Sequence, residues 1–188
     1  MLDDHQLACA AMLTLCGPFT PMLFMGEEWA ASTPFQFFTS HPEPELGRAT
    51  AEGRIAEFER MGWDPGVVPD PQDPATFARS TLDWSEAGTG RHARILDVYR
   101  RLGRLRRERP ELTDPSFGGV SCAADEARRV FTMQRGDLLV AVNFGDADAQ
   151  VPTEADYLLF ATGEDVILAS GVLMLPAHAG AVVSPGGC

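Results

Sequence analysis

Apolar residues recur three and four positions apart between residues 4 and 16, a spacing that places them on one face of a helix. They are Leu7, Ala8, Ala11, Met12 and Leu15. Asp3 or Asp4 can cap the start of this helix, and Gly17-Pro18 ends it. The pattern predicts an amphipathic helix over residues 4–16.

Residues 92–109 show the clearest helical period of the chain, and Pro110 follows them. The apolar stripe consists of Ile95, Val98, Tyr99, Leu102 and Leu105, and arginines cover the other face. An arginine run of this kind is compatible with an RNA-binding helix. In so acidic a chain we interpret it as a solvated helix face.

From about residue 118 the apolar period changes to two, which is typical of strands with one buried face. Val130–Gln134 and Leu138–Phe144 flank the turn Arg135-Gly136-Asp137, an arrangement that predicts a β-hairpin. Further short strands are expected at Leu158–Phe160, Val166–Ala169, Val172–Leu175 and Ala181–Val183. Residues 118–188 are therefore predicted to form a small antiparallel β-domain.

A short apolar run, Met22 to Met25, lies between Pro21 and Gly26 and is followed at once by Glu27, Glu28 and Trp29. An uninterrupted apolar run of this length suits a strand buried on both faces, as in a parallel sheet. Acids and an aromatic after such a strand stand where α/β barrels build their active sites. The alternative is a core strand followed by a solvated acidic turn.

Residues 30–90 are rich in proline and in aromatic side chains, and a helix is expected between about Glu43 and Arg60. A loop of this length inside a compact domain is usually functional. Because flexible linkers are poor in aromatics, we expect an ordered excursion that packs on another part of the protein.

Composition excludes several classes of partner. The formal net charge of the 188 residues is −12, and none of the 15 basic residues is lysine. A chain this acidic disfavours nucleic acid and anionic membranes, since binding either depends on neutralising phosphates. The cysteines Cys9, Cys16, Cys122 and Cys188 show no metal-ligand spacing and are interpreted as reduced thiols. With no basic leader segment, these features predict a cytoplasmic protein without metal or other cofactor.

The segment Thr20–Trp29 resembles the eighth barrel strand of the α-amylase-type glycoside hydrolases, family 13, in which a proline, two apolar residues and an aromatic precede Gly-x-Glu. Pro21, Phe24, Gly26 and Glu28 occupy those positions. The continuation through residues 27–46, together with 69–77 and 82–84, resembles the maltooligosyltrehalose trehalohydrolases of that family.

This resemblance implies a fold that is α/β plus all-β: the last strand and helices of a (β/α)8 TIM barrel, followed by a small antiparallel β-sandwich domain. Residues 1–117 would be the C-terminal part of the catalytic barrel, with the excursion at 30–90. The reaction implied is hydrolysis of the α-1,4 bond that releases trehalose from maltooligosyltrehalose. The family's catalytic carboxylates follow strands four, five and seven, so no catalytic residue is expected in this chain.

The expected substrate-binding residues are Glu28, Trp29, Glu27 and Phe35. Glu28 would face substrate or form a structural salt bridge, and Glu27 would support it. Trp29 and Phe35 could stack on sugar rings or simply pack, and for the phenylalanines, Phe37 and Phe38 included, packing is favoured.

Two classes of function remain open. The chain could be the C-terminal segment of a trehalohydrolase, inactive without the N-terminal part of the barrel. Alternatively, it could be a non-catalytic glucan-binding or interaction module, or part of another α-amylase-type enzyme such as a glucan branching enzyme. In either case the expected partner is maltooligosyltrehalose or a related α-glucan.

Overall fold

A computed structural model describes residues 2–186 of the chain. It divides into two compact units, one made of residues 1–30 with 88–188 and one made of residues 31–87. The second unit nearly coincides with the excursion expected at residues 30–90. Each unit is described by itself below.

The larger unit begins with α1 (Asp4–Cys16), the 3-10 helix η1 (Glu27–Trp29), α4 (Gly90–Glu108) and the short α5 (Pro110–Thr113). Asp3 caps α1, since its carboxylate accepts a hydrogen bond from the Gln6 backbone N–H. Both helices predicted by the apolar period are therefore confirmed. Pro110 starts a new helical turn at the point where α4 ends, which a proline at the first helical position allows.

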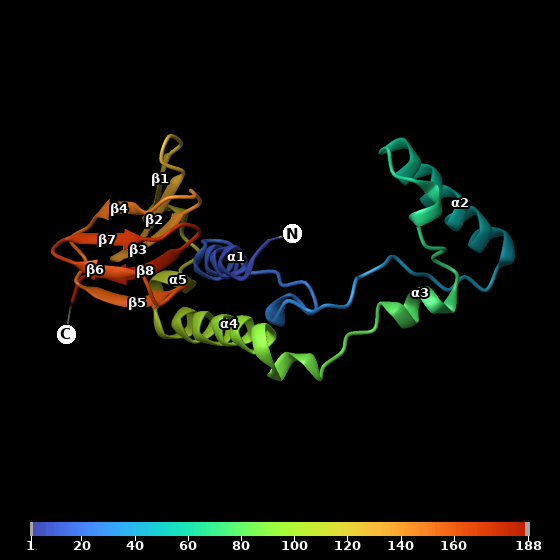
Figure 1. Cartoon of the computed structure of the whole chain (residues 1–188), viewed down its shortest axis with the longest axis horizontal. Coiled ribbons are helices and arrows are strands. Elements are labelled where there is room, and N and C mark those ends of the chain that lie inside the picture. The colour runs from blue at the N-terminus through green and yellow to red at the C-terminus, as the bar shows by residue number, and fades with distance from the viewer. Residues whose placement is uncertain (1, 187–188) are drawn as a thin grey trace. The chain divides into compact units, whose positions relative to one another are not determined.

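Eight strands follow the helices in two antiparallel sheets (Figure 1). One sheet has the order β1-β2-β3-β8-β5 and the other the order β4-β7-β6. The bounds are β1 Val120–Asp125, β2 Val130–Arg135, β3 Leu138–Asn143, β4 Ala149–Pro152, β5 Tyr157–Ala161, β6 Ile167–Ala169, β7 Val172–Leu175 and β8 Gly180–Ser184. The predicted hairpin is confirmed, with Arg135 paired to Leu138 across the turn and Gly136 at φ 56°.

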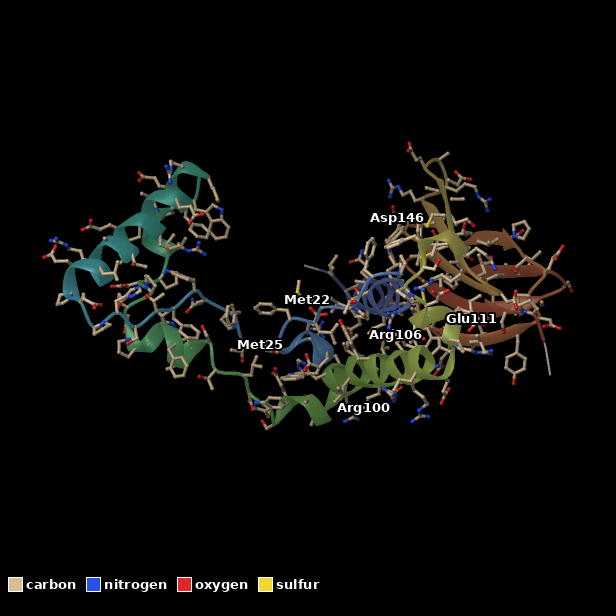
Figure 2. The ribbon with its side chains drawn as sticks, turned by 180° about the vertical axis from the view of Figure 1, so that it is seen from behind. Met22, Met25, Arg100, Arg106, Glu111 and Asp146 are labelled. Carbon is tan, nitrogen blue, oxygen red and sulfur yellow. The ribbon has the colours of Figure 1, made fainter. Side chains whose placement is uncertain are left out.

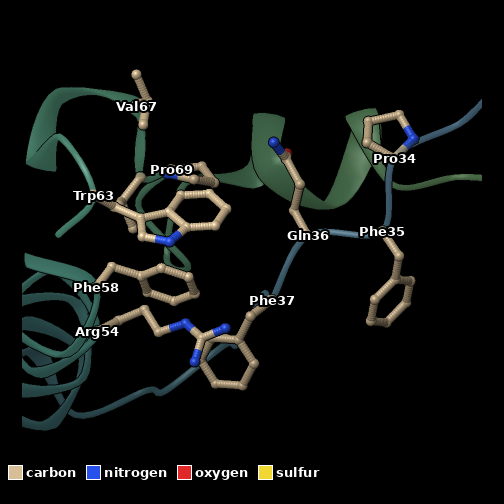
Figure 3. Close-up of a pocket in the computed structure, with 10 residues that line it drawn as sticks. Pro34, Phe35, Gln36, Phe37, Arg54, Phe58, Trp63, Val67 and Pro69 are labelled. Atoms are coloured by element: carbon tan, nitrogen blue, oxygen red, sulfur yellow. The ribbon is translucent and has the colours of Figure 1, made fainter. Parts of the chain in front are cut away.

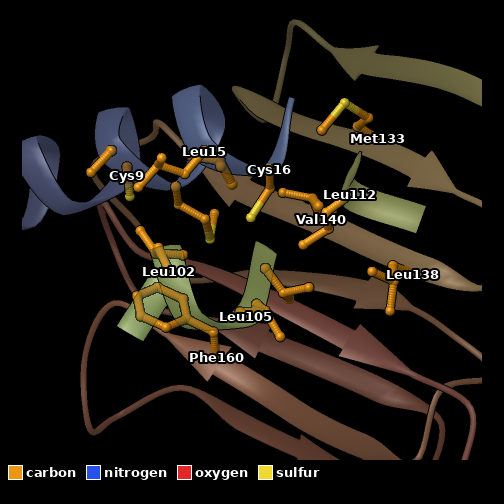
Figure 4. Close-up of a cluster of buried hydrophobic side chains, with 14 residues drawn as sticks. Cys9, Leu15, Cys16, Leu102, Leu105, Leu112, Met133, Leu138, Val140 and Phe160 are labelled. Atoms are coloured by element: carbon orange, nitrogen blue, oxygen red, sulfur yellow. The ribbon is translucent and has the colours of Figure 1, made fainter. Parts of the chain in front are cut away.

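Alternation along β3 explains how the five-stranded sheet separates two cores. Val140 and Val142 face α1 and α4, and Ala141 faces the other sheet. The helix-side core also contains Leu15 from α1 and Leu102 from α4 (Figure 4). The unit thus has three layers, two helices over a β-sandwich. Because the helices share a core with the sheet, the structure shows them as one compact unit. The domain boundary expected at residues 117 and 118 remains a prediction.

The smaller unit contains α2 (Pro44–Arg60), the 3-10 helix η2 (Pro65–Val67) and the short α3 (Pro74–Arg79). The predicted helix over 43–60 is confirmed as α2. Gln72 ties the chain entering α2 to the chain entering α3: its side chain accepts from the His41 backbone N–H at 3.1 Å and donates to the Thr39 hydroxyl. The excursion is therefore ordered by its own hydrogen bonds, and His41 has a structural role through its backbone.

The strand expected at Met22–Met25 is not formed in this chain. All strand pairs among the described residues are antiparallel and lie in the two sheets of the sandwich. Met22, Phe24 and Met25 are exposed by 89%, 51% and 58%. A parallel strand needs neighbours that supply its hydrogen bonds, and the described residues provide none beside this segment. The predicted strand is therefore wrong for the chain as it stands.

The buried cysteines behave as small apolar side chains. Burial raises the pKa of the Cys9 thiol to about 11 and that of Cys16 to about 12. Cys122 is exposed on β1, and Cys188 lies outside the described residues. Among the described helices, none is both long enough and apolar enough to cross a membrane.

Candidate functional site

The chain reaches the candidate site from the C-terminal end of α1, where two arginines bind the last carbonyls. Arg106 Nη1 on α4 donates to Leu15 O at 2.6 Å and to Gly17 O at 3.2 Å. Arg135 Nη1 on β2 donates to Cys16 O at 3.2 Å and to Gly17 O at 2.6 Å. Cations at a helix C-terminus satisfy its free carbonyls and oppose its dipole. The exit of α1 is thereby fixed to α4 and to the sheet.

The segment that follows is the exposed apolar run, and Figure 2 labels Met22 and Met25 on it. The run ends in a tight corner, Gly26–Ala30. Gly26 has φ 88° and Ala30 has φ 52°, both in the left-handed region. Ala30 N donates to Glu27 O at 3.0 Å, which closes the turn of η1. Gly26 suits its position because a side chain there would be strained.

Glu27 is held in place by the corner and by α4. Its Oε1 accepts from the Tyr99 hydroxyl at 2.9 Å, and its Oε2 accepts from the Phe24 backbone N–H at 2.9 Å. Burial raises the pKa of the Tyr99 phenol, and the hydrogen bond to the Glu27 carboxylate raises it further. Tyr99 therefore stays a donor, and both oxygens of Glu27 are occupied. The supporting role expected for Glu27 in a substrate site stays a prediction.

Glu28 is differently placed. Its Oε2 accepts from the Gly26 backbone N–H at 3.0 Å, and the residue is half-buried. Within the described part of the chain its Oε1 makes no protein hydrogen bond. A carboxylate fixed by one oxygen and open at the other can accept a hydrogen bond from a sugar hydroxyl. A salt bridge to Glu28 is not found among residues 2–186.

Trp29 anchors the corner to the rest of the unit. Its side chain is only 2% exposed, and its backbone carbonyl lies 2.9 Å from His92 Nδ1 at the start of α4. A stacking platform needs an open ring face, and a buried indole offers none in this chain. Trp29 therefore fixes the corner, and the substrate contacts expected of Trp29 and Glu28 stay predictions.

Phe35 belongs to the smaller unit, where it is 50% exposed and its ring centroid lies 6.1 Å from that of Phe38. Phe38 in turn makes an edge contact with Phe77 of α3, with centroids 5.1 Å apart. These rings contact one another within the excursion, and Phe35 is half exposed; whether Phe35 also contacts a sugar stays a prediction.

The sequence did not reveal the roles of Tyr99 and Arg106. These residues lie outside the Gly26–Ala30 corner, and their side chains fix the corner and the chain that leads to it. Tyr99 was assigned to the apolar stripe of its helix, and Arg106 to a solvated face. Arg106 instead reaches back to α1, and Tyr99 turns its hydroxyl to Glu27. Only their three-dimensional neighbours show these roles, because an amphipathic stripe says nothing about what a polar tip contacts. No cluster of three or more potential metal ligands is found among the described residues.

The architecture assigns the chain to a class of proteins. Its fold matches a structure described as a putative α-amylase from Salmonella typhimurium, with a TM-score of 0.77, 29% identity, and coverage of 96% of this chain and 30% of that one. Residues 115–182 match the family model described as a domain of unknown function, DUF3459. The fold is that of part of an α-amylase-type protein: helices and a β-sandwich, with the acidic corner Gly26–Ala30 held against α4.

Sequence similarity is more specific. The chain is 58% identical over 182 residues to a malto-oligosyltrehalose trehalohydrolase of Brevibacterium helvolum. The aligned region covers 97% of this chain and 31% of the relative. It is 61% identical over 163 residues to one of Arthrobacter ramosus, covering 87% of this chain and 28% of the relative. The chain is thus a relative of the malto-oligosyltrehalose trehalohydrolases, matches their C-terminal portion, and spans about a third of their length.

Proposed function

We propose that this chain is the C-terminal segment of a glycoside hydrolase that releases trehalose from maltooligosyltrehalose. The observation that carries the proposal is the similarity of nearly the whole chain to trehalohydrolases, at 58% identity over 97% of its residues. In this proposal the substrate is an α-glucan ending in a trehalose unit. Water cleaves the α-1,4 bond next to that unit, and the glycosidic oxygen leaves with a proton.

Such a reaction needs one carboxylic acid to protonate the leaving oxygen and one carboxylate on the opposite face of the sugar. The corner supplies no such pair, since Glu27 already spends both oxygens on Tyr99 and Phe24. The proposal therefore assigns the chemistry to residues outside this chain and gives the corner a binding role. Glu28 would accept a hydrogen bond from substrate, and Glu27 and Trp29 would hold the corner. Phe35 would contact glucan within the smaller unit, where it lines a pocket.

The exposed apolar run supports a requirement for the N-terminal part of the barrel. Met22, Phe24 and Met25 are adjacent, apolar and largely exposed, and monomeric soluble proteins rarely leave large contiguous apolar patches in water. In the proposal this segment adds to the barrel as a strand. That step would give the segment neighbouring strands, and among the described residues it pairs with none.

The direct test compares the 188-residue chain with a longer protein that carries the N-terminal part of the barrel. Trehalose release from maltooligosyltrehalose is measured by chromatography. We expect no turnover by the chain alone and turnover by the longer protein. Turnover by the chain alone would show that the chemistry does not lie outside it.

The corner is tested in the longer protein with Glu28→Gln, which removes the charge and retains the shape. We expect kcat/KM to fall at least about tenfold, the effect of losing one charge-assisted hydrogen bond to a ligand. Glu126→Gln is the matched control, because Glu126 lies exposed in the turn after β1. Equal activity of both variants would remove Glu28 from the substrate site.

The second candidate function is that of a non-catalytic glucan-binding module. An aromatic pocket in the smaller unit favours it, and this pocket does not involve the corner.

A further inference from the structure

The smaller unit contains a pocket of about 390 Å³ that lies wholly within residues 34–69 (Figure 3). Its wall comes from three stretches: the extended chain at residues 34–37, the second half of α2, and the loop that carries η2. The volume is within the range of small-molecule sites, and the wall is mostly apolar with a few polar groups, as such sites usually are. The lining residues used below are Gln36, Phe37, Arg54, Phe58, Trp63 and Pro69.

Trp63 is the largest ring of the pocket. It is 56% exposed, and its centroid lies 5.1 Å from that of Phe58 at an interplanar angle of 74°. Its backbone N–H donates to Phe58 O at 3.0 Å, which fixes the loop to the end of α2. Trp63 is thus a rigidly mounted aromatic that still offers much of its surface to a ligand.

Arg54 gives the pocket its polar group. Its guanidinium carbon lies 4.3 Å from the centroid of the Phe58 ring and 5.0 Å from that of Phe37, so the two rings hold the guanidinium in place. Nη1 donates to Glu57 Oε2 at 3.0 Å. A guanidinium carries five N–H donors, and the Glu57 contact uses one of them. Donors therefore remain for a ligand, while the positive charge is balanced by Glu57.

This combination favours a neutral ligand with hydroxyl groups. A pocket that selected an anion would need an unbalanced cation, and Arg54 is paired with Glu57 at 3.0 Å. A purely apolar ligand would leave the guanidinium donors without acceptors. A sugar suits both the aromatic wall and the guanidinium, because its apolar face stacks on an aromatic ring and its hydroxyl oxygens accept hydrogen bonds from a guanidinium.

We infer that this pocket binds glucose units of an α-glucan, with Trp63 as the stacking platform and Arg54 as a hydroxyl donor. The choice of α-glucan rests on the proposed function, in which the substrate is a maltooligosaccharide derivative. None of the residues that line the pocket belongs to the Gly26–Ala30 corner, so the inference concerns residues to which the proposed function gives no role in holding that corner.

The inference is tested by titrating the 188-residue chain with maltohexaose in a calorimeter, with the β-linked cellohexaose and a proline-rich peptide as competing ligand classes. We expect saturable binding of maltohexaose in the millimolar range and weaker binding of the other two. Absence of maltohexaose binding, or tighter binding of cellohexaose or of the peptide, would overturn the assignment.

Two variants locate the binding. Trp63→Ala and Arg54→Met should each weaken maltohexaose binding, Trp63→Ala by at least about fivefold, which corresponds to the loss of about 1 kcal/mol from an aromatic contact. Trp84→Ala is the matched control: Trp84 is 71% exposed in the same unit but does not line the pocket. Far-UV circular dichroism and thermal unfolding verify that all variants are folded. Binding by Trp63→Ala equal to that of Trp84→Ala would refute the inference.

The outcomes separate this inference from the proposed function. Trehalose release by the longer protein with unaltered binding in Trp63→Ala would refute the pocket assignment alone. Loss of binding in Trp63→Ala with no trehalose release by the longer protein would refute the proposed function and uphold an α-glucan site.

Discussion

Replacing Arg135 should be among the most destabilising single changes in the larger unit. Its side chain is 2% exposed although it carries a charge, and it donates to three backbone carbonyls. Two lie at the end of α1, on Cys16 and Gly17, and the third is Asp114 O after α5, at 2.8 Å. One side chain therefore joins α1, β2 and the chain leaving α5. Burial, and then the nearby Arg106, lowers the pKa of this guanidinium.

The magnitude follows from the carbonyls left behind in Arg135→Met. Gly17 O retains its bond from Arg106 at 3.2 Å, whereas Cys16 O and Asp114 O lose a charged donor. An unsatisfied buried polar group costs about 1–3 kcal/mol. Removing a buried charge recovers part of that loss. We expect a net destabilisation of about 2–4 kcal/mol.

The assay is urea unfolding followed by tryptophan fluorescence, in a chain whose Trp63 and Trp84 are replaced by phenylalanine. The remaining Trp29 is 2% exposed and belongs to the larger unit. Arg128→Met is the matched control, because Arg128 also donates to a backbone carbonyl, Gln150 O at 2.7 Å, but is exposed. Its variant should lose less than about 0.5 kcal/mol. A loss below about 1 kcal/mol in Arg135→Met, or one no larger than that of the control, would refute the reasoning.

Three further changes have defined outcomes. Asn143→Leu should lower the free energy of unfolding by about 2–4 kcal/mol in the same urea assay, since the buried amide donates to Ala147, Leu175 and Pro176 carbonyls; a loss under about 0.5 kcal/mol would contradict this. Gly26→Ala should cost about 1 kcal/mol and lower the melting temperature, because residue 26 has φ 88°; an unchanged melting temperature would show that the corner relaxes freely. Burial raises the Asp4 pKa, but hydrogen bonds from two α4 arginines outweigh it and leave that pKa below its ordinary value. The resulting stabilisation is therefore present above the unfolded-state pKa and lost as pH falls through the folded one. Asp4→Asn should destabilise by about 0.5–1 kcal/mol in thermal melts at pH 7 and by less at pH 3, and an equal effect at both would exclude the ion pairs as its cause.

Much of the larger unit could be predicted because its elements carry strong periods. The stripe along α4 and the glycine turn between β2 and β3 are local signals, and the structure confirms both elements. Strands β1 and β4 were not predicted. Five of the six residues of β1 are exposed, and β4 ends in Pro152, so neither shows an apolar alternation of useful length. Both lie at sheet edges, where pairing with a neighbour rather than burial defines the strand.

The position of the candidate site could be predicted from the sequence, but the separate roles of Glu27 and Glu28 could not. Its glycine and two glutamates mark a corner, yet nothing local distinguishes Glu27 from Glu28. The distinction arises from Tyr99, 72 residues away, whose hydroxyl occupies an oxygen of Glu27. Arg135 was hidden for a related reason. It stands next to a turn glycine, where charged residues are normally solvated, and its burial depends on carbonyls from α1.

The corner Gly26–Ala30 and the apolar run Met22–Met25 before it differ in how well contacts within this chain stabilise them. Gly26–Ala30 is fixed within this chain by the Glu27–Tyr99 bond, by buried Trp29 and by the contact of His92 with the Trp29 carbonyl. Met22–Met25 instead has largely exposed side chains. Within the proposed function, association with the barrel would then order chiefly the apolar run, because the acidic corner is already formed. A preformed corner lowers the entropy cost of association and lets burial of the apolar run supply the affinity. The chain would therefore contribute Glu28 to the glucan site in a geometry set before the barrel is complete.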